Sequence, residues 1–272
     1  MNWKKILLGT FSLKRLFTLV VLIYIIATIF AHFYAQKLIF PYHQSSYNEK
    51  VSGLKFLKAE DGTKIATRFW KAAHEKALIL YFHGNYMDMG HLDDIAEFLN
   101  TKGYSVLAMD YRGYGLSEGE VKESNAYTDA QVVYDYALKS GYDSDDIVIL
   151  GRSVGTGVAT NLAVNNKAKT LVLISPFLSI YRIMTNYPLF LFDKFNNVAK
   201  IDNIHMPLFI IHGSNDHVIP AWHSQKLIEN HQGKHKRILI QGAGHNDIYD
   251  DKYLDFVNEI DEFILRSSRQ SK

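Results

Sequence analysis

Short apolar runs alternate with longer segments of mixed polarity between residues 50 and 266. Runs of four to eight residues that are bounded by turn residues are typical of buried strands, and the segments between them have the length of helices. The apolar runs include 77–82, 104–109, 146–150, 208–211 and 237–240, and the helix-length segments include 92–99, 126–138 and 253–265. This alternation predicts a mainly parallel sheet with helices on both faces.

An antiparallel hairpin is predicted at one edge of this sheet. Residues 53–60 and 63–70 are joined at Asp61-Gly62, a dipeptide that favours a tight hairpin turn. The chain has 272 residues, of which 47% are hydrophobic, so it is long enough to bury one large core. The pattern therefore predicts one α/β domain.

The N-terminal segment follows a different pattern. No charged side chain lies from Leu16 through Gln36, and residues 19–30 are nearly all aliphatic or aromatic. Because this stretch is long enough to cross a bilayer as a helix, we predict a single transmembrane span. Two alternatives stay open. A cleaved signal peptide is disfavoured by the long apolar run and the lack of a clean Ala-x-Ala site, and a buried soluble helix is disfavoured by an apolar surface on every side.

The basic residues around the span predict its orientation. Four Lys and Arg side chains precede it, against two in the stretch that follows. The positive-inside rule then places the N-terminus in the cytoplasm and the globular part outside, which is the periplasm if the protein is bacterial. We expect a cytoplasmic stub and anchor over residues 1–37 and a globular domain over residues 38–272.

Charge and cysteine content exclude several classes of function. The first 37 residues hold five of the 30 Lys and Arg and no acidic residue, which leaves 25 basic and 28 acidic groups, a net charge of −3, for the rest. A mildly acidic globular part lacks the basic surface of a nucleic-acid-binding protein. The absence of cysteine excludes disulfides, a thiol nucleophile and a Cys-type metal site.

A Gly-x-Ser-x-Gly motif carries the strongest chemical signal. Residues 151–155 follow an apolar run and precede a helix-compatible segment, 156–163, which places Ser153 on a strand-to-helix turn. Such a turn lifts the hydroxyl clear of the backbone, and the helix N-terminus beyond it favours developing negative charge. Glycines on both sides remove the Cβ atoms that would collide in so tight a turn. Ser153 is therefore the predicted nucleophile.

A base and an orienting carboxylate follow later in the chain. Asp216 lies in a loop just beyond the buried run 208–211, and His245 lies in a glycine-containing loop after the last run, 237–240. Open α/β sheets place their chemistry at such strand ends. A serine nucleophile needs a base to take its proton and a carboxylate to hold that base in the right tautomer. We predict His245 as the general base and Asp216 as its partner.

From about residue 50 to 266 the chain resembles the α/β-hydrolase superfamily, whose triads follow the same order Ser, Asp, His. His83-Gly84-Asn85, 151–155, 212–220 and 242–247, behind an N-terminal membrane segment, resemble the membrane-anchored α/β-hydrolase-domain serine hydrolases. That branch includes lysophospholipid and monoacylglycerol lipases and protein depalmitoylases. Residues 153–161 look more like the lipases and 242–247 more like the depalmitoylases, so the substrate stays open.

The resemblance implies an α/β-hydrolase fold with a mostly parallel eight-stranded sheet and a short helical cap. It also implies an oxyanion hole formed by the backbone N–H groups of Asn85 and Val154. Tyr86 departs from many relatives, which carry a small residue there, and we expect it to narrow the pocket.

The predicted cap covers about residues 176–206, between Ser175-Pro176 and Met206-Pro207. It is short for such an insertion, which predicts an open cleft. Its first half is rich in large apolar and aromatic residues, which could line an acyl-chain groove, face the bilayer, or pack on the core.

Other chemistries fit these residues less well. The glycines of 151–157 lack the Gly-x-Gly-x-x-Gly spacing of a dinucleotide loop, and Asp216-His217 and Asp93-Asp94 match no metal-binding spacing. We expect no cofactor and no metal. His83 and His212, each followed by glycine, are predicted to be structural.

We therefore predict a membrane-anchored serine hydrolase that cleaves carboxylic ester or thioester bonds of lipid or acylated substrates through an acyl-enzyme. A serine peptidase on the same fold is the first alternative, and a non-catalytic binding protein on a hydrolase fold is the second. Halide or epoxide chemistry is disfavoured because those relatives carry Asp where Ser153 stands. The oligomeric state stays open.

Overall fold

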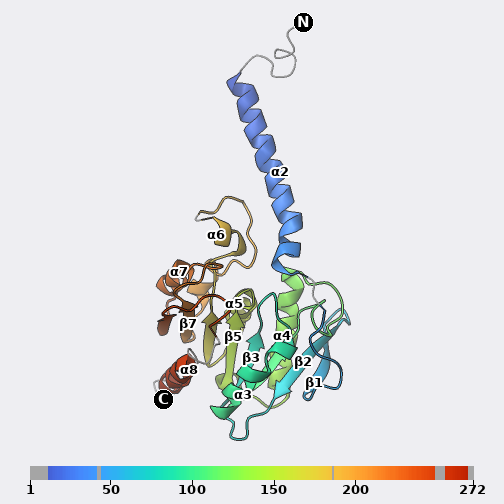
Figure 1. Cartoon of the computed structure of the whole chain (residues 1–272), viewed down its shortest axis with the longest axis vertical. Coiled ribbons are helices and arrows are strands. Elements are labelled where there is room, and N and C mark those ends of the chain that lie inside the picture. Colours follow the sequence, from blue (N-terminus) through green and yellow to red (C-terminus); the bar gives the residue numbers. More distant parts are fainter. Residues whose placement is uncertain (1–11, 42–43, 186, 249–254, 269–272) are drawn as a thin grey trace. The chain divides into compact units, whose positions relative to one another are not determined.

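The computed structural model describes residues 12–41, 44–185, 187–248 and 255–268 (Figure 1). The chain divides into two compact units, Met1–Phe40 and Pro41–Lys272. Each unit is described by itself below.

The first unit contains one long helix, α2 (Leu13–Ile39). Its segment Leu13–Phe33 has a mean hydropathy of 2.4, and none of its most apolar stretch is buried within the protein. A helix satisfies its own backbone hydrogen bonds, which is what a chain in lipid requires. By length and composition this helix is able to cross a bilayer, and a signal sequence has the same properties.

The second unit is built on one eight-stranded sheet with the order β1-β2-β4-β3-β5-β6-β7-β8. β1 is antiparallel to β2, β2 is antiparallel to β4, and the other pairs are parallel. The strands are β1 (Leu54–Lys58), β2 (Lys64–Trp70), β3 (Ala77–Phe82), β4 (Tyr104–Met109), β5 (Ile147–Arg152), β6 (Thr170–Ile174), β7 (Leu208–Gly213) and β8 (His235–Ile240). The mostly parallel sheet and its edge hairpin confirm the fold predicted from the sequence.

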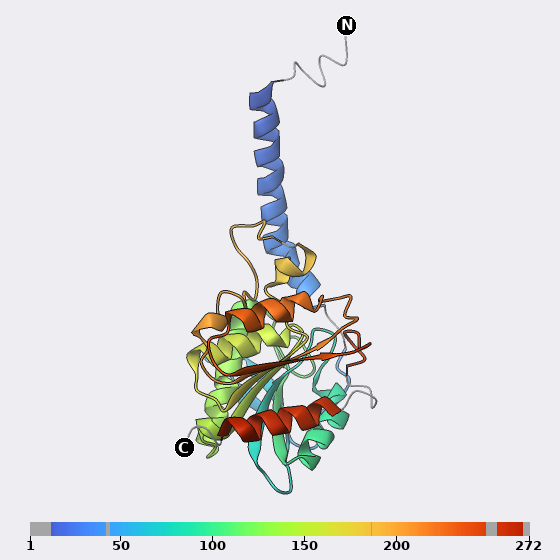
Figure 2. The same ribbon diagram turned by 90° about the vertical axis from the view of Figure 1, so that its left-hand side faces the viewer.

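Helices cover both faces of the sheet. Figure 2 shows α3 and α8 on one face and α5 and α7 on the other. The helices are α3 (Asp93–Thr101), α4 (Glu123–Lys139), α5 (Gly155–Asn165), α6 (Ile180–Met184), α7 (Trp222–Asn230) and α8 (Asp255–Ser268), with 3₁₀ turns η1 (Met89–His91), η2 (Ser144–Asp146) and η3 (Ile201–Asn203). Three of them lie where helix-length segments were predicted, although residues 253 and 254 of the last prediction lie outside the described residues.

Burial on both faces explains why the central strands of the sheet are nearly continuous apolar runs. Every residue of β3, β4, β5, β6 and β7 is buried, whereas β8 at the edge is mostly half-buried. A strand covered by helices on both sides has no solvent-facing position for a polar side chain. Each buried Val, Leu, Ile or Phe contributes about 1.5–3 kcal/mol relative to exposure.

In the described residues of the cap segment between β6 and β7, the helical turns are α6 and η3. Its beginning packs on the core, because Phe177 and Leu178 are buried. Phe195 is also buried, with a φ of 47°, and packs so closely on α5 that a Cβ at Gly157 would lie 2.4 Å from its ring. Between these anchors four large apolar side chains are exposed: Met184, Tyr187, Leu189 and Leu191. The cap therefore combines packed ends with an apolar surface loop.

Candidate active site

Ser153 lies on the turn between β5 and α5, as the sequence predicts. Its φ of 51° is in the left-handed region, which costs a non-glycine residue about 1–2 kcal/mol. A Cβ at Gly151 would lie 2.4 Å from the carbonyl oxygen of Gly155, and a Cβ at Gly155 would lie 2.1 Å from that of Phe82. Both glycines are therefore required for the chain to turn this sharply.

The structure brings Ser153, His245 and Asp216 together at the carboxyl edge of the sheet. His245 Nε2 lies 2.9 Å from Ser153 Oγ, and His245 Nδ1 lies 2.7 Å from Asp216 Oδ2. Ser153 follows β5 directly, while the other two lie in the loops that follow β7 and β8. Because neighbouring parallel strands end at the same edge, residues 92 positions apart in the chain become neighbours.

Asp216 is buried, and its surroundings favour the charged form. Its Oδ1 accepts hydrogen bonds from the backbone N–H groups of Val218 at 3.0 Å and Ile219 at 2.7 Å. Burial by itself would raise the pKa of Asp216, but hydrogen bonds from His212 and His245 and from the Ile219 N–H outweigh it and hold the pKa well below its usual range. The carboxylate therefore only accepts, so His245 Nδ1 carries a proton and Nε2 is left to accept one from Ser153.

His83 and His212, which lie at the ends of β3 and β7, both contact backbone carbonyl groups. His83 Nδ1 lies 2.8 Å from the oxygen of Gly84, and His212 Nε2 lies 2.7 Å from that of Ile219. His212 Nε2 is also 3.3 Å from Asp216 Oδ2. These contacts suit the structural roles predicted for them.

The two backbone N–H groups expected to form an oxyanion hole belong to segments close to Ser153. Val154 follows it, and the segment of Asn85 passes close by, because a Cβ at Gly84 would lie 3.6 Å from the Ser153 Cβ. Within the described part of the chain, neither N–H donates a hydrogen bond. Val154 is buried, and a buried N–H without a partner is rare unless a ligand takes that place. Tyr86, expected to narrow the pocket, has an exposed side chain.

Arg152 is a residue of this site that the sequence reasoning did not single out. Its buried guanidinium donates from Nη2 to the carbonyl oxygen of His245 at 3.0 Å, and its Nη1 lies 2.6 Å from Met87 Sδ. It therefore joins the loop of His245 to the loop after β3. The available signal was a basic side chain at the end of an otherwise apolar strand, directly before Ser153.

Comparison with known proteins identifies the family. Residues 73–200 match the family described as "Serine aminopeptidase, S33". The human alpha/beta hydrolase domain-containing protein 17B is 30% identical over 213 residues, which cover 76% of this chain and 73% of the relative.

Solved structures agree on the fold. An esterase of Pyrococcus furiosus superimposes with a TM-score of 0.69 at 21% identity, over 84% of this chain and 97% of the other. The monoacylglycerol lipase of Paleococcus ferrophilus gives a TM-score of 0.61 at 17% identity, over 75% and 99% of the two chains. The resemblance seen in the sequence is thus confirmed: this chain is a hydrolase that belongs to the α/β-hydrolase superfamily, in the branch of the alpha/beta hydrolase domain-containing 17 proteins.

Proposed function

We propose that this protein is a membrane-anchored serine hydrolase that cleaves carboxylic ester or thioester bonds of lipid or acylated substrates. The observation that carries the proposal is the single row of hydrogen-bond contacts from Asp216 through His245 to Ser153, with 2.7 Å and 2.9 Å between the paired atoms. This arrangement raises the reactivity of a hydroxyl that is otherwise a weak nucleophile.

In the proposed mechanism, Ser153 Oγ attacks the substrate carbonyl carbon while His245 Nε2 takes its proton. The carbonyl oxygen becomes an oxyanion and accepts hydrogen bonds from the N–H groups of Asn85 and Val154. When the tetrahedral intermediate collapses, His245 returns the proton to the leaving alcohol or thiol, and an acyl-Ser153 ester remains. Water, deprotonated by His245, then releases the carboxylic acid and regenerates Ser153. Asp216 holds the His245 ring and stabilises its cationic form throughout.

The cap supports a substrate that carries an acyl chain. Met184 and Leu191 are 88% and 94% exposed, which is unusual for large apolar side chains that lie within one short loop. A hydrocarbon chain that contacts them would lose water-exposed surface, at about 0.8 kcal/mol for each buried CH₂ group. A soluble substrate without a hydrocarbon chain would gain no comparable binding energy from these side chains.

The anchor is part of the proposal. We assign α2 as one transmembrane span, with the N-terminus in the cytoplasm and the catalytic domain, residues 38–272, outside. Protease added to spheroplasts should then digest the domain. Protection of the domain in intact spheroplasts would reverse the orientation, and an N-terminus that begins after the span in the mature protein would identify a signal peptide.

The decisive experiment compares the full-length protein with Ser153→Ala on a chain-length series of esters and thioesters. The substitution should lower kcat by a factor of about 10⁴ or more and abolish labelling by a fluorophosphonate, which bonds covalently to an activated serine. Ser140→Ala, which removes an exposed hydroxyl at the end of α4, is the matched control and should retain wild-type activity. Activity of Ser153→Ala within a few-fold of wild type would refute the assignment.

A peptidase is the second candidate, because the matching family is described by a serine aminopeptidase. The same triad cleaves amides, so the ester series should be run in parallel with aminoacyl amides. We expect a kcat/KM for acyl esters at least about 100-fold above that for aminoacyl amides, and the reverse order would replace the proposed substrate class. A protein that neither labels nor turns over any substrate would be a non-catalytic binding protein.

A further inference from the structure

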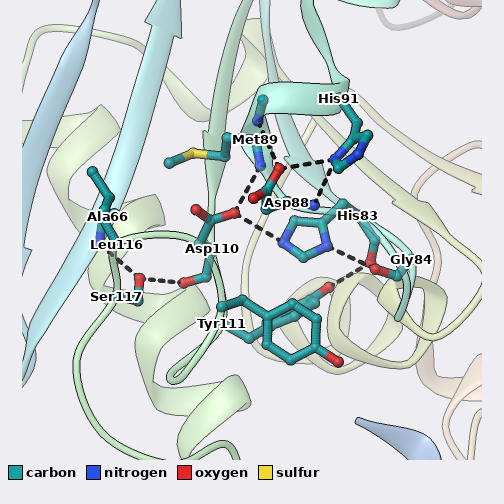
Figure 3. A network of polar contacts seen from close by, with 12 residues as sticks. Ala66, His83, Gly84, Asp88, Met89, His91, Asp110, Tyr111, Leu116 and Ser117 are labelled. Atoms are coloured by element: carbon teal, nitrogen blue, oxygen red, sulfur yellow. Dashed lines mark hydrogen bonds and ion pairs between the residues drawn. The ribbon is translucent and has the colours of Figure 1, made fainter. Parts of the chain in front are cut away.

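Asp110 is a buried carboxylate at the end of β4 that contacts both ends of the loop containing Asn85. We call residues 83–89 the oxyanion loop. Asp110 Oδ1 accepts from the backbone N–H of Met89 at 2.8 Å and lies 3.3 Å from His83 Nε2, so one oxygen reaches the first and the last residue of the loop (Figure 3). Displacement of Asp110 would therefore release the hydrogen bond at Met89, the last residue of the loop.

The second oxygen of Asp110 is held from the N-terminal side of the domain. Residues 44–47, here called the connector, follow the first unit of the chain. The hydroxyl of Tyr47 in the connector donates to Asp110 Oδ2. Burial and the neighbouring Asp110 carboxylate raise the pKa of Tyr47 well above its usual value, so the phenol keeps its proton and remains a donor.

The connector also holds a second carboxylate within the oxyanion loop. Asp88 accepts from the backbone N–H of Ser46 at 2.7 Å and from the Ser46 hydroxyl, and its Oδ1 lies 2.9 Å from His91 Nδ1 (Figure 3 shows the His91 contact). Burial would raise the pKa of Asp88, but the Ser46 N–H and hydroxyl and the His91 ring hold it below its usual value. Two consecutive connector residues thus hydrogen-bond two carboxylates: Ser46 bonds Asp88, 42 positions away in the chain, and Tyr47 bonds Asp110, 63 positions away.

Two glycines make room for these contacts. A Cβ at Gly90 would lie 2.2 Å from the Ser46 Oγ. Gly115 has a φ of 49°, and a Cβ there would lie 1.8 Å from Asp110 Oδ2 and 2.8 Å from the Tyr47 hydroxyl oxygen. Any side chain at either position would displace the connector or the carboxylate that it contacts.

The contacts reach the peptide group that carries the Asn85 N–H. His83 Nδ1 donates to the carbonyl oxygen of Gly84, at 2.8 Å, and this carbonyl and the Asn85 N–H belong to the same planar peptide. In a trans peptide the two groups point in opposite directions, so fixing the carbonyl also aims the N–H. The hydroxyls of Tyr111 and Tyr114 donate to the carbonyl oxygens of His83 and Asn85, each at 2.9 Å, and orient the two neighbouring peptides.

We propose that Ser46 and Tyr47 are positioning residues of the active site, which act through Asp88 and Asp110 to hold the oxyanion loop so that the Asn85 N–H points at the substrate oxyanion. This inference rests on the proposed function, because it requires Ser153 to form an oxyanion next to Asn85. It extends the catalytic machinery into the segment that leads from the anchor to the domain.

The expected effect is a loss in transition-state stabilisation with little change in substrate binding. Removing an oxyanion-hole donor altogether costs a factor of about 10² to 10³ in kcat. Misaiming the Asn85 N–H should cost less. We expect the double variant Ser46→Ala/Tyr47→Phe, in the full-length protein, to lower kcat by about 10- to 50-fold on a short-chain ester while KM stays within about twofold.

The inhibition constant of a trifluoromethyl ketone distinguishes a positioning role of Ser46 and Tyr47 from a purely structural one. Ser153 Oγ adds to its carbonyl carbon, the hydroxyl proton passes to His245, and the resulting oxyanion occupies the same place as in turnover. Its inhibition constant should rise by the same factor as kcat/KM falls, because both report binding of a tetrahedral oxyanion. Gly90→Ala, which pushes on the Ser46 hydroxyl, should change both quantities in the same direction as Ser46→Ala does.

Tyr104→Phe is the matched control. Its hydroxyl also donates to a carboxylate, Asp261 at 2.6 Å, but it lies at the opposite end of β4 from Asp110. The control should retain wild-type kcat, KM and inhibition. The proposal is overturned if the double variant behaves like Tyr104→Phe, or if it loses activity and thermal stability while the inhibition constant stays unchanged. If Ser153→Ala remains active, the proposed function itself has failed, whatever the connector variants do.

Discussion

The carboxyl edge of the sheet and the cap segment differ in which side chains they bury. At the edge, the polar groups of Ser153 and Asp216 are only 7% and 5% exposed and each is hydrogen-bonded. In the cap, the large apolar groups of Met184 and Leu191 stand almost fully in solvent. Both arrangements reverse the usual preference of these residue types. Under the proposed function, this difference assigns the reaction to the edge and contact with an apolar acyl chain to the cap.

The largest effect should come from the edge and should not depend on the substrate chain. Asp216→Asn keeps the size of the side chain, but its amide can no longer hold His245 with the proton on Nδ1. We expect kcat to fall by about 10³ to 10⁴ for short and long acyl chains alike. Steady-state kinetics across the chain-length series measures this. Asp202→Asn, on an exposed carboxylate of η3, serves as the control. A fall in kcat of less than tenfold, or one seen only with long acyl chains, would contradict the proposal that the edge performs the reaction and the cap binds the acyl chain.

A moderate and selective effect should come from the cap. Met184→Ser/Leu191→Ser removes apolar surface that a long acyl chain would contact, without touching Ser153, His245 or Asp216. We expect KM for a long-chain ester to rise about tenfold, while kcat and the kinetics on a short-chain ester stay within about twofold. Leu138→Ser changes an exposed leucine on α4 outside the cap and should leave both substrates unaffected. Equal losses on short and long chains would place these side chains in the chemistry instead.

A small, pH-dependent effect should come from the place where the two regions meet. His223 Nδ1 accepts from the backbone N–H of Leu178, at the start of the cap, at a distance of 3.2 Å. Burial, with smaller effects from His212 and Arg182, lowers the pKa of His223 to about 4. Because the folded pKa lies below the unfolded value of about 6.5, this stabilisation is complete above pH 6.5 and is lost as the pH falls towards 4.

Thermal unfolding between pH 7 and pH 4 tests that contribution. In His223→Asn the amide can still accept from Leu178 but does not titrate, so the fall in Tm over this range should be smaller than in wild type by about 5 °C. His74→Asn, at an exposed histidine, should leave the wild-type dependence unchanged. If Tm falls by the same amount in both variants between pH 7 and pH 4, protonation of His223 does not destabilise the contact between α7 and the cap.

The sequence predicted the centre of the fold well because its strands are buried along their whole length. The limits of β3 and β4 coincide with the predicted apolar runs, whereas β5 and β7 each continue two residues beyond them, to Arg152 and Gly213. Helix starts were harder to predict. α4 begins at Glu123, three residues before the predicted start at residue 126. Its first turn is polar and carries an acidic side chain, which suits a helix N-terminus but shows no apolar periodicity. Apolar pattern therefore locates the body of a helix better than its ends.

Within the site, the sequence singled out the three side chains that the structure brings together, because each follows a strand of the same sheet. Their catalytic roles stay predictions until Ser153→Ala and Asp216→Asn are measured. The contacts of Arg152, Ser46 and Tyr47 could not be predicted, since they depend on how separate loops fold over one another. For Ser46 and Tyr47 the sequence offered Gly90 and Gly115, but a glycine alone does not say which atom it makes room for.

Phe195 has a consequence for how new specificities could arise in this protein. Its ring packs on Gly157 in the helix that begins next to Ser153, so any movement of the second half of the cap would have to break this contact. Sequence changes are therefore best tolerated in the short stretch around residues 184–191. Buried residues pack on the core before and after this stretch. Under the proposed function, exchange of that stretch alone would change which substrates bind, while the contacts among Ser153, His245 and Asp216 stayed in place.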